Sequence, residues 1–242
     1  MKENRYDDEV FFAKYGEMLR SKNGLKGAGE WPELKKLLPD FHGKRVLDLG
    51  CGYGWHCKYA AAHGAAYILG TDISHKMLEI AREKNADEKI KYECKAMEDL
   101  DFEECSFDVV ISSLAFHYVK DFAPLVQKIY KWLKKGGDFV FSVEHPVFTA
   151  YGSQDWYYDS QGNILHFPVD NYYYEGKRDA IFLGERVTKY HRTLTTYLNT
   201  LLDNGFTITH VVEPKPPQEL MDIEGMKDEM RRPMMLLVSA KK

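Results

Sequence analysis

The stretch VLDLGCGYGWH, residues 46–56, decides the fold of this 242-residue chain. An apolar run that carries one acid, Asp48, is followed by glycines at every second position, Gly50, Gly52 and Gly54. Glycine adopts left-handed backbone conformations and lets a ligand press against the main chain. The stretch therefore predicts a strand that ends in a tight turn around a nucleotide-like ligand, with the aspartate at its mouth.

Short apolar runs alternate with helical patterns on both sides of this turn. Strands are expected at 45–50, 66–72, 90–96, 107–113, 138–143, 206–212 and 234–240, and helices at 55–64, from Ser74, at 122–133 and at 194–202. Gly136-Gly137 is expected to end the third of these helices. Such alternation predicts an α/β fold with a doubly wound, Rossmann-like sheet of seven strands, mostly parallel with an antiparallel last strand.

Two segments do not follow the alternating pattern of strands and helices: one precedes the core domain at 44–242, and the other is inserted into it. Residues 1–43 are expected to form an N-terminal helical lid or extension, because Phe11, Phe12 and Tyr15 recur at helical spacing. These aromatics could cover a ligand or simply pack on the core. Residues 144–190 lack helical periodicity and hold about a third of the chain's aromatic residues. This aromatic-rich cap insert could line a substrate chamber, pack on itself as a β-rich cap, or form a dimer interface.

Composition excludes several function classes. The net charge of −4 gives no general attraction to nucleic acid, so no such partner is expected. The four cysteines form no CxxC pair and no spaced Cys/His cluster, so neither a zinc site nor a disulfide framework is expected. No apolar run approaches the ~18 residues of a membrane span, and the polar start MKENRYDDEV is unlike a secretory signal. We therefore expect a cytoplasmic protein with no membrane partner.

The acid in the turn narrows the choice of ligand. In the dinucleotide fingerprint the glycines have GxGxxG spacing, whereas here the third comes one residue early and Trp55 stands in its place. A pyrophosphate at a helix N-terminus prefers positive potential, which a carboxylate at Asp48 opposes. S-adenosylmethionine carries an ammonium and a sulfonium but no phosphate, so it would favour that carboxylate. An NAD-dependent oxidoreductase stays an alternative, because Asp72 follows Gly54 at a suitable distance.

The whole pattern resembles the class I S-adenosylmethionine-dependent methyltransferases. DLGCGYG at 48–54 matches the first motif of that family, and the resemblance is good from about residue 44 to 143. It implies that Asp72 accepts hydrogen bonds from the ribose hydroxyls, that residues 96–98 border the adenine ring, and that 106–119 lies beneath the sulfonium. The cofactor-binding residues that it implies are Asp48, Gly50, Cys51, Gly52, Gly54, Asp72, Ile73, Ala96, Met97, Glu98, Ser113 and Leu114.

The expected activity is methyl transfer from S-adenosyl-L-methionine, with S-adenosyl-L-homocysteine as product, to a small, aromatic or apolar acceptor by in-line displacement. The segment SSLAF (112–116) lacks the Asn/Asp-Pro-Pro-aromatic turn typical of enzymes that methylate amino groups on bases. His117 and His145 are the candidate catalytic residues, although either could be structural, and a base helps only with some acceptors. A non-catalytic cofactor-binding protein is a further alternative. The chain is expected to be a monomer or a homodimer.

Overall fold

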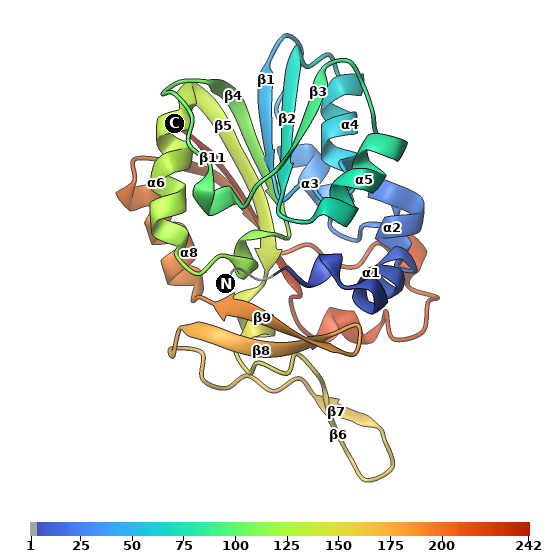
Figure 1. Cartoon of the computed structure of the whole chain (residues 1–242). Coiled ribbons are helices and arrows are strands. Elements are labelled where there is room, and N and C mark those ends of the chain that lie inside the picture. Colours follow the sequence, from blue (N-terminus) through green and yellow to red (C-terminus); the bar gives the residue numbers. More distant parts are fainter. Residues whose placement is uncertain (1–3) are drawn as a thin grey trace.

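The computed structural model describes residues 4–242 and contains one seven-stranded sheet (Figure 1). In sheet order the strands are β10 (Thr207–Val212), β11 (Met235–Lys241), β5 (Leu133–Glu144), β4 (Phe107–Ser113), β1 (Arg45–Leu49), β2 (Tyr67–Asp72) and β3 (Ile90–Cys94). β11 is antiparallel to both neighbours and the other pairs are parallel. The predicted mostly parallel, Rossmann-like sheet with an antiparallel last strand is confirmed. A ligand crevice is expected at the carboxyl ends of β1 and β4, where the strand order reverses.

Helices cover both faces of this sheet. One face carries α3 (Trp31–Leu37), α4 (Trp55–Ala62) and α5 (His75–Lys84), and the other carries α6 (Phe122–Trp132) and α8 (Leu194–Asp203) (Figure 1). The alternation of side chains along a strand sorts the two layers. Val46 of β1 packs in one core cluster with Cys57 of α4, whereas Leu47 and Leu49 pack in the other with Ile129 of α6.

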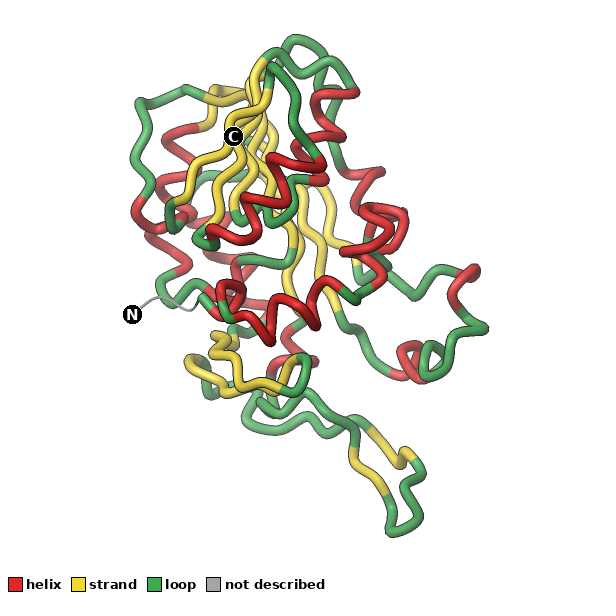
Figure 2. The backbone as a smooth tube through the Cα atoms, turned by 45° about the vertical axis from the view of Figure 1, so that its right-hand side comes forward, coloured by secondary structure: helices red, strands yellow, loops and turns green. Residues whose placement is uncertain are grey.

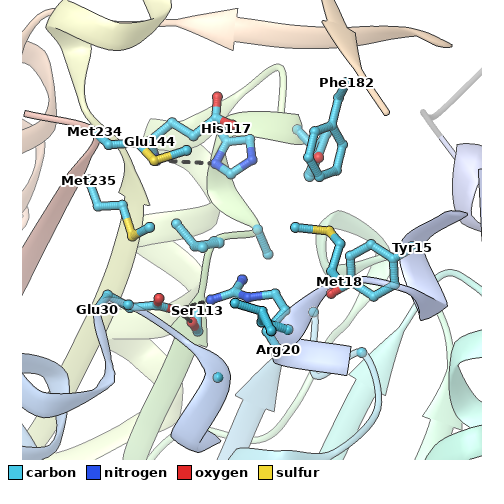
Figure 3. A pocket seen from close by; sticks show the side chains of 18 of the residues that line it. Tyr15, Met18, Arg20, Glu30, Ser113, His117, Glu144, Phe182, Met234 and Met235 are labelled. Carbon is cyan, nitrogen blue, oxygen red and sulfur yellow. Dashed lines mark hydrogen bonds and ion pairs between the residues drawn. The ribbon is translucent and has the colours of Figure 1, made fainter. Parts of the chain in front are cut away.

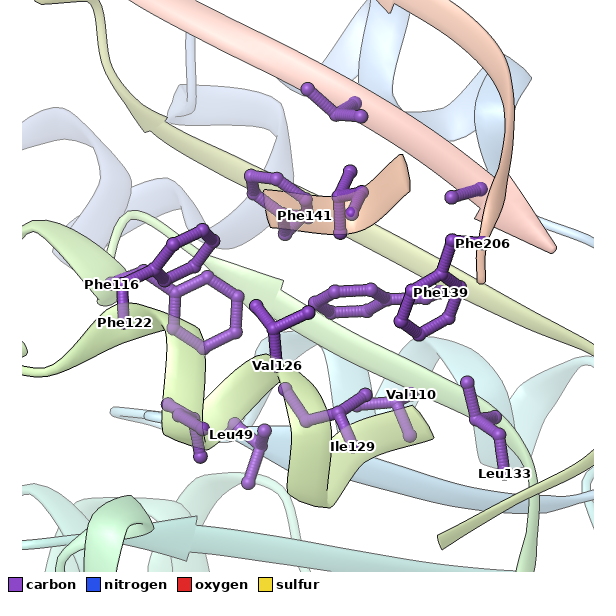
Figure 4. Packing of buried hydrophobic residues seen from close by; sticks show 14 of the residues in the cluster. Leu49, Val110, Phe116, Phe122, Val126, Ile129, Leu133, Phe139, Phe141 and Phe206 are labelled. Carbon is purple, nitrogen blue, oxygen red and sulfur yellow. The ribbon is translucent and has the colours of Figure 1, made fainter. Parts of the chain in front are cut away.

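The α6 layer is the larger of the two cores and is rich in phenylalanine (Figure 4). Phe122, Val126 and Ile129 of α6 are buried against Phe139 and Phe141 of β5. Each such side chain contributes roughly 1.5–3 kcal/mol when it is fully removed from water. This packing fixes the ends of β4 and β5, which carry residues of the site described below.

The C-terminus of α6 differs from the expectation. The helix ends at Trp132 and β5 begins at once with Leu133, so Gly136 and Gly137 lie inside a strand rather than beyond a helix. The register between β4 and β5 shifts after Leu133, and Gly136 has a φ of 77°. Glycine accommodates such an irregularity in a strand, so sheet pairing overrides the usual helix-stop signal.

The segments outside the core lie at the carboxyl edge of the sheet. The N-terminal helices are α1 (Glu9–Gly16) and α2 (Leu19–Asn23), and the insert consists of α7 (Pro146–Thr149) and the strands β6 (Tyr157–Tyr158), β7 (Ile164–His166), β8 (Gly176–Phe182) and β9 (Glu185–His191). Both strand pairs are antiparallel, and Figure 2 shows the β6–β7 hairpin projecting from the body.

Short 3-10 turns join these elements. They are Arg5–Asp7, Gly24–Gly27, Met97–Asp99, Phe116–Tyr118, Gln218–Leu220 and Asp228–Arg231. Within residues 4–242, no helix is both long and apolar enough to cross a membrane. The same residues contain no group of three or more His, Cys, Asp or Glu side chains placed to hold a metal ion.

Candidate active site

A cavity of about 790 Å³ lies at the carboxyl ends of the central strands. Its walls come from the glycine turn, the N-terminal helices, the insert and residues 213–234, which we call the lid segment and which connect β10 to β11. In Figure 3, Arg20, Glu30 and Ser113 lie on one side, and His117 and Glu144 lie on the other. We call the side with Arg20, Glu30 and Ser113 the cofactor half and the side with His117 and Glu144 the acceptor half, after the roles proposed for them below.

Most of the residues predicted from the sequence line this cavity. They are Gly50, Gly52, Asp72, Ile73, Ala96, Met97, Glu98, Ser113 and Leu114, together with His117. Asp48, Cys51, Gly54 and His145 do not belong to its lining. The predicted set is thus brought together by the fold, apart from these four residues.

The glycine turn brings backbone close to the cavity. Gly50 has a φ of 71°, and a Cβ there would lie 2.5 Å from the Cβ of Ala115. Gly52 has a φ of 53°, and its N–H donates a hydrogen bond of 2.8 Å to Asp72 Oδ2. A side chain at Gly50 would therefore collide with the loop after β4, and the left-handed backbone disfavours one at either position.

Asp72, at the end of β2, is fixed by backbone donors. Its Oδ1 accepts from Ser74 N–H at 2.9 Å, while Oδ2 holds the turn through Gly52. Burial raises the pKa of Asp72, and these hydrogen bonds oppose that rise. The carboxylate is therefore held in one orientation at the cavity wall, with lone pairs left to accept further donors.

Asp48 lies beneath the turn and not at its mouth, which differs from the expectation. Its side chain shares the α4 face of β1 with Val46, is 1% exposed, and accepts a hydrogen bond from the Cys57 thiol at 3.3 Å. Burial raises the pKa of Asp48 to about 7. The strand alternation that sorts the core thus places this carboxyl under α4, and it does not line the cavity.

Gly54 and Cys51 support the turn from below instead of lining the cavity. A Cβ at Gly54 would lie 2.3 Å from the Tyr92 hydroxyl, so this glycine is needed for packing against β3. Cys51 is buried, and a Cβ added at Gly70 would lie 3.0 Å from its sulfur. Both residues shape the turn through tight packing, and neither has atoms in the cavity wall.

Arg20 and Glu30 are site residues that the sequence analysis missed. Glu30 is 1% exposed and forms an ion pair with Arg20, and Ser113 Oγ donates to its Oε1 at 3.4 Å. Burial would raise the pKa of Glu30, but the Arg20 guanidinium outweighs this and lowers it. Glu30 Oε2 has no hydrogen-bond partner among residues 4–242. The only local signal is the turn GAGE at 27–30, which carries no recognisable motif.

His117 lies in the 3-10 turn after β4 and faces the acceptor half (Figure 3). Burial lowers the pKa of His117 to about 4, so the ring is neutral near pH 7. Its Nδ1 accepts a hydrogen bond of 3.4 Å from Glu144 N–H. In the neutral ring the proton therefore sits on Nε2, which becomes a donor.

His145 is turned away from the cavity, contrary to its prediction as a catalytic candidate. Its Nδ1 accepts from Val147 N–H at 3.1 Å as the N-cap of α7, and its Nε2 lies 2.8 Å from Glu213 Oε1. Because side chains alternate along β5, Glu144 and His145 point in different directions. His145 does not line the cavity, whereas Glu144 does, so a catalytic role of His145 stays a prediction from the sequence.

The sequence and the fold of this chain are similar to those of known methyltransferases. Residues 47–141 match the model of a family described as methyltransferase domain. A solved structure from Mesorhizobium loti, an S-adenosylmethionine-dependent methyltransferase, is 44% identical with a TM-score of 0.83, over 90% of this chain and 100% of that one. A second solved structure, of an S-adenosylmethionine-dependent methyltransferase from Listeria monocytogenes, is 59% identical with a TM-score of 0.87. The match covers 90% of this chain and 99% of that one. The chain belongs to the class I S-adenosylmethionine-dependent methyltransferases.

The relatives of this methyltransferase differ in their acceptors. A protein of Haemophilus influenzae is 34% identical over 98% of this chain and 96% of its own length. A ubiquinone biosynthesis O-methyltransferase of Neisseria meningitidis is 41% identical over 43% of this chain and 45% of its own. A phosphoethanolamine N-methyltransferase of Arabidopsis thaliana is 31% identical over 51% of this chain and 25% of its own length. The last two matches span less than half of those enzymes, so they do not decide the acceptor.

The cavity of this methyltransferase fits S-adenosylmethionine. The turn presents its backbone to the cavity at Gly50 and Gly52, and the neighbouring Asp72 can accept from hydroxyl groups. Glu30 Oε2 and Thr71 Oγ1 are buried without a partner among residues 4–242, and both residues line the cavity. Such unpaired buried oxygens are costly in a folded protein, and the ammonium of the cofactor would satisfy a carboxylate oxygen.

Proposed function

We propose that this methyltransferase acts on a small, aromatic or apolar acceptor by in-line displacement. The observation that carries the proposal is the apolar part of the cavity wall, because Trp156, Phe182, Met234 and Met235 line the same cavity as His117. Aromatic rings and thioethers complement a flat apolar molecule, and a few polar groups set its orientation.

We propose that the cofactor half holds the cofactor as the family resemblance implies. Asp72 accepts from the ribose hydroxyls, residues 96–98 border the adenine ring, and Ser113 and Leu114 lie near the sulfonium. The unpaired Glu30 Oε2 supports a contact to the ammonium. Its partner Arg20 lines the same wall and is suited to the carboxylate of the amino-acid end. The N-terminal helices thereby act as a lid for the cofactor.

The residues of the chain mainly orient the acceptor and exclude water. When bound, the cofactor would supply a methyl carbon: the bond from this carbon to sulfur would break, a bond to the acceptor atom would form, any proton on that atom would pass to solvent, and a neutral thioether would leave. Holding the acceptor in line is worth several powers of ten in rate. Because His117 carries its proton on Nε2, we assign it to donating a hydrogen bond to the acceptor and not to removing a proton.

Two measurements test this function in sequence. Calorimetric titration with S-adenosylhomocysteine is expected to give a dissociation constant well below 1 mM, and no binding at millimolar ligand would refute the cofactor assignment. Transfer of a labelled methyl group is then measured with a panel of phenols, quinols, heterocycles, aliphatic amines and phosphoethanolamine. Transfer to aromatic members supports the proposal, whereas transfer confined to phosphoethanolamine would refute the acceptor class.

No observation favours the alternative functions. The glycine spacing departs from the dinucleotide fingerprint, because Trp55 stands where the third glycine is expected. The comparisons give no support to an oxidoreductase or to a non-catalytic module. A cytoplasmic location, the absence of nucleic-acid partners, and a monomeric or homodimeric state stay predictions from the sequence.

A further inference from the structure

A closed ring of hydrogen bonds joins three distant segments at the wall of the acceptor half. Glu144 ends β5, Gln154 precedes β6, and Lys189 lies in β9. Lys189 Nζ donates to Glu144 Oε1 at 2.6 Å and to Gln154 Oε1 at 2.7 Å. Gln154 Nε2 donates to Glu144 Oε2 at 2.6 Å, which closes the ring. Of the three residues, Glu144 lines the cavity.

Burying the charged groups of this ring costs desolvation free energy, which indicates that the ring has a role other than stabilising the fold. The Lys189 side chain is 2% exposed and that of Glu144 is 13% exposed. Removing two charges from water costs several kcal/mol per ion, so a buried pair is weak evidence for stability. Gln154 also has a φ of 60°, a backbone conformation that residues other than glycine rarely adopt. Strained residues and buried polar networks of this kind concentrate at binding sites.

We propose that this ring recognises the acceptor, and that the acceptor is a neutral aromatic compound that presents a hydroxyl group. The inference rests on the proposed function and narrows its substrate class. Each oxygen of Glu144 accepts one hydrogen bond within the ring, so each keeps a lone pair for an O–H donor. The N–H of His117 on the same side of the cavity donates in return. A hydroxyl group both donates and accepts, so it matches both residues at once.

The charges of the ring disfavour the other acceptor classes. The ammonium of Lys189 and the carboxylate of Glu144 cancel, so the ring offers no net charge to a phosphate or to a quaternary ammonium group. A protonated aliphatic amine has no lone pair to accept from His117. Glu144 is thus the contacting residue, while Lys189 and Gln154 are positioning residues that hold its carboxylate ionised and oriented.

A matched pair of ligands and a matched pair of proteins test the contact. Binding of 2-naphthol and of 2-methoxynaphthalene, which lacks the O–H donor, is measured by calorimetry on protein saturated with S-adenosylhomocysteine. For the wild type we expect 2-naphthol to bind at least 10-fold more tightly, because a hydrogen bond to a charged group is stronger than one between neutral groups. In Glu144→Gln the preference is expected to fall below threefold.

Variants of the positioning residue separate recognition from folding. Lys189→Met is expected to raise the KM for the naphthol at least fivefold with a smaller change in kcat, and Lys189→Arg to restore most of it. Lys177→Met, at an exposed lysine of the same β8–β9 hairpin, is the control and is expected to change neither constant. Affinity for S-adenosylhomocysteine is expected to stay within twofold of wild type throughout. If Lys189→Met does not fold, the Glu144→Gln comparison still decides.

The outcomes distinguish this inference from the function on which it rests. An undiminished preference for 2-naphthol in Glu144→Gln would overturn the ring as the recognition element. Methyl transfer to apolar aromatics without a hydroxyl, at rates equal to phenols, would overturn the hydroxyl requirement but leave the proposed function intact. Failure of every aromatic acceptor, with cofactor binding preserved, would refute both.

Discussion

The two halves of the cavity are built from different kinds of structure. The cofactor half combines strand ends and the turn residues Gly50 and Gly52 with Arg20 and Glu30 of the N-terminal segment. The acceptor half combines His117 and Glu144, at the carboxyl ends of β4 and β5, with residues of the insert and of the lid segment, which are distant in the chain. We therefore expect cofactor binding to depend more on the strand ends and the turn, and acceptor selection to depend more on contacts between separate segments.

One buried cation shows how the acceptor half is held together. The guanidinium of Arg232, in the lid segment, lies 4.5 Å from the ring centre of Phe148, 4.7 Å from Phe167 and 5.0 Å from Trp156. It also forms two hydrogen bonds with Glu229. These contacts attach the lid segment to the insert. Residues of the cavity wall that lie at strand ends are instead held in place by the pairing of the strands.

The largest expected effect comes from Gly50→Ala in the cofactor half. The new Cβ would meet the Ala115 Cβ at 2.5 Å in addition to the strain of a φ of 71°. We expect destabilisation of about 3 kcal/mol and at least a 100-fold loss of S-adenosylhomocysteine affinity, measured by urea denaturation and calorimetry. Gly136→Ala is the matched control, because its φ is 77° but nothing lies within 4 Å of the added Cβ. Equal effects at both sites would show that strain, and not close approach, decides.

Asp48→Asn tests the buried carboxyl beneath the turn. Because the folded pKa of Asp48 is raised from 3.8 to about 7, its contribution to stability falls as the pH rises between these values. Relative to wild type, the variant is therefore expected to gain about 2–3 kcal/mol in free energy of unfolding between pH 5 and pH 8. Urea denaturation at both pH values measures this gain. Asp101→Asn, at an exposed carboxylate, is expected to show no such gain, and a flat difference for Asp48→Asn would contradict the raised pKa.

Glu30→Gln removes the charge proposed to meet the cofactor ammonium. We expect about a 10-fold loss of S-adenosylhomocysteine affinity, which corresponds to one charge-assisted hydrogen bond. The KM for the acceptor is expected to change little, because Glu30 lies on the cofactor side (Figure 3). Glu33→Gln, at an exposed ion pair of α3, serves as the control. An unchanged affinity in Glu30→Gln would remove this residue from the cofactor site.

The smallest effect is expected for Arg232→Met in the acceptor half. Loss of its cation–π contacts should loosen the lid segment by about 1 kcal/mol. We expect the acceptor KM to rise about fivefold while affinity for S-adenosylhomocysteine stays within twofold, as calorimetry and steady-state kinetics would show. Lys227→Met, at an exposed lysine of the same segment, should change neither. If Arg232→Met weakened acceptor binding and S-adenosylhomocysteine binding equally, the two halves of the cavity would not act independently.

The sequence predicted the sheet and much of the cofactor half because both depend on local patterns. Periodic apolar residues gave the strands and helices, and glycine spacing located the turn whose Gly50 and Gly52 line the cavity. The sequence misplaced the end of α6, because pairing of Leu133 with β4 outweighed two glycines. It named His145 as a candidate at the end of β5, whereas the neighbouring Glu144 lines the cavity, since the direction of each side chain at a strand end was not fixed by the pattern.

By itself, the amino-acid sequence determined the α/β sheet, the position of the turn, and the kind of cofactor. Only the tertiary structure showed that Asp48 lies under α4, that Glu30 pairs with Arg20, and that Glu144 forms a ring with residues from the insert. Backbone conformation and apolar periodicity involve near neighbours in the chain, so they can be read locally. Burial, pKa and ion pairing depend on which distant segments pack together, and no local pattern encodes that arrangement.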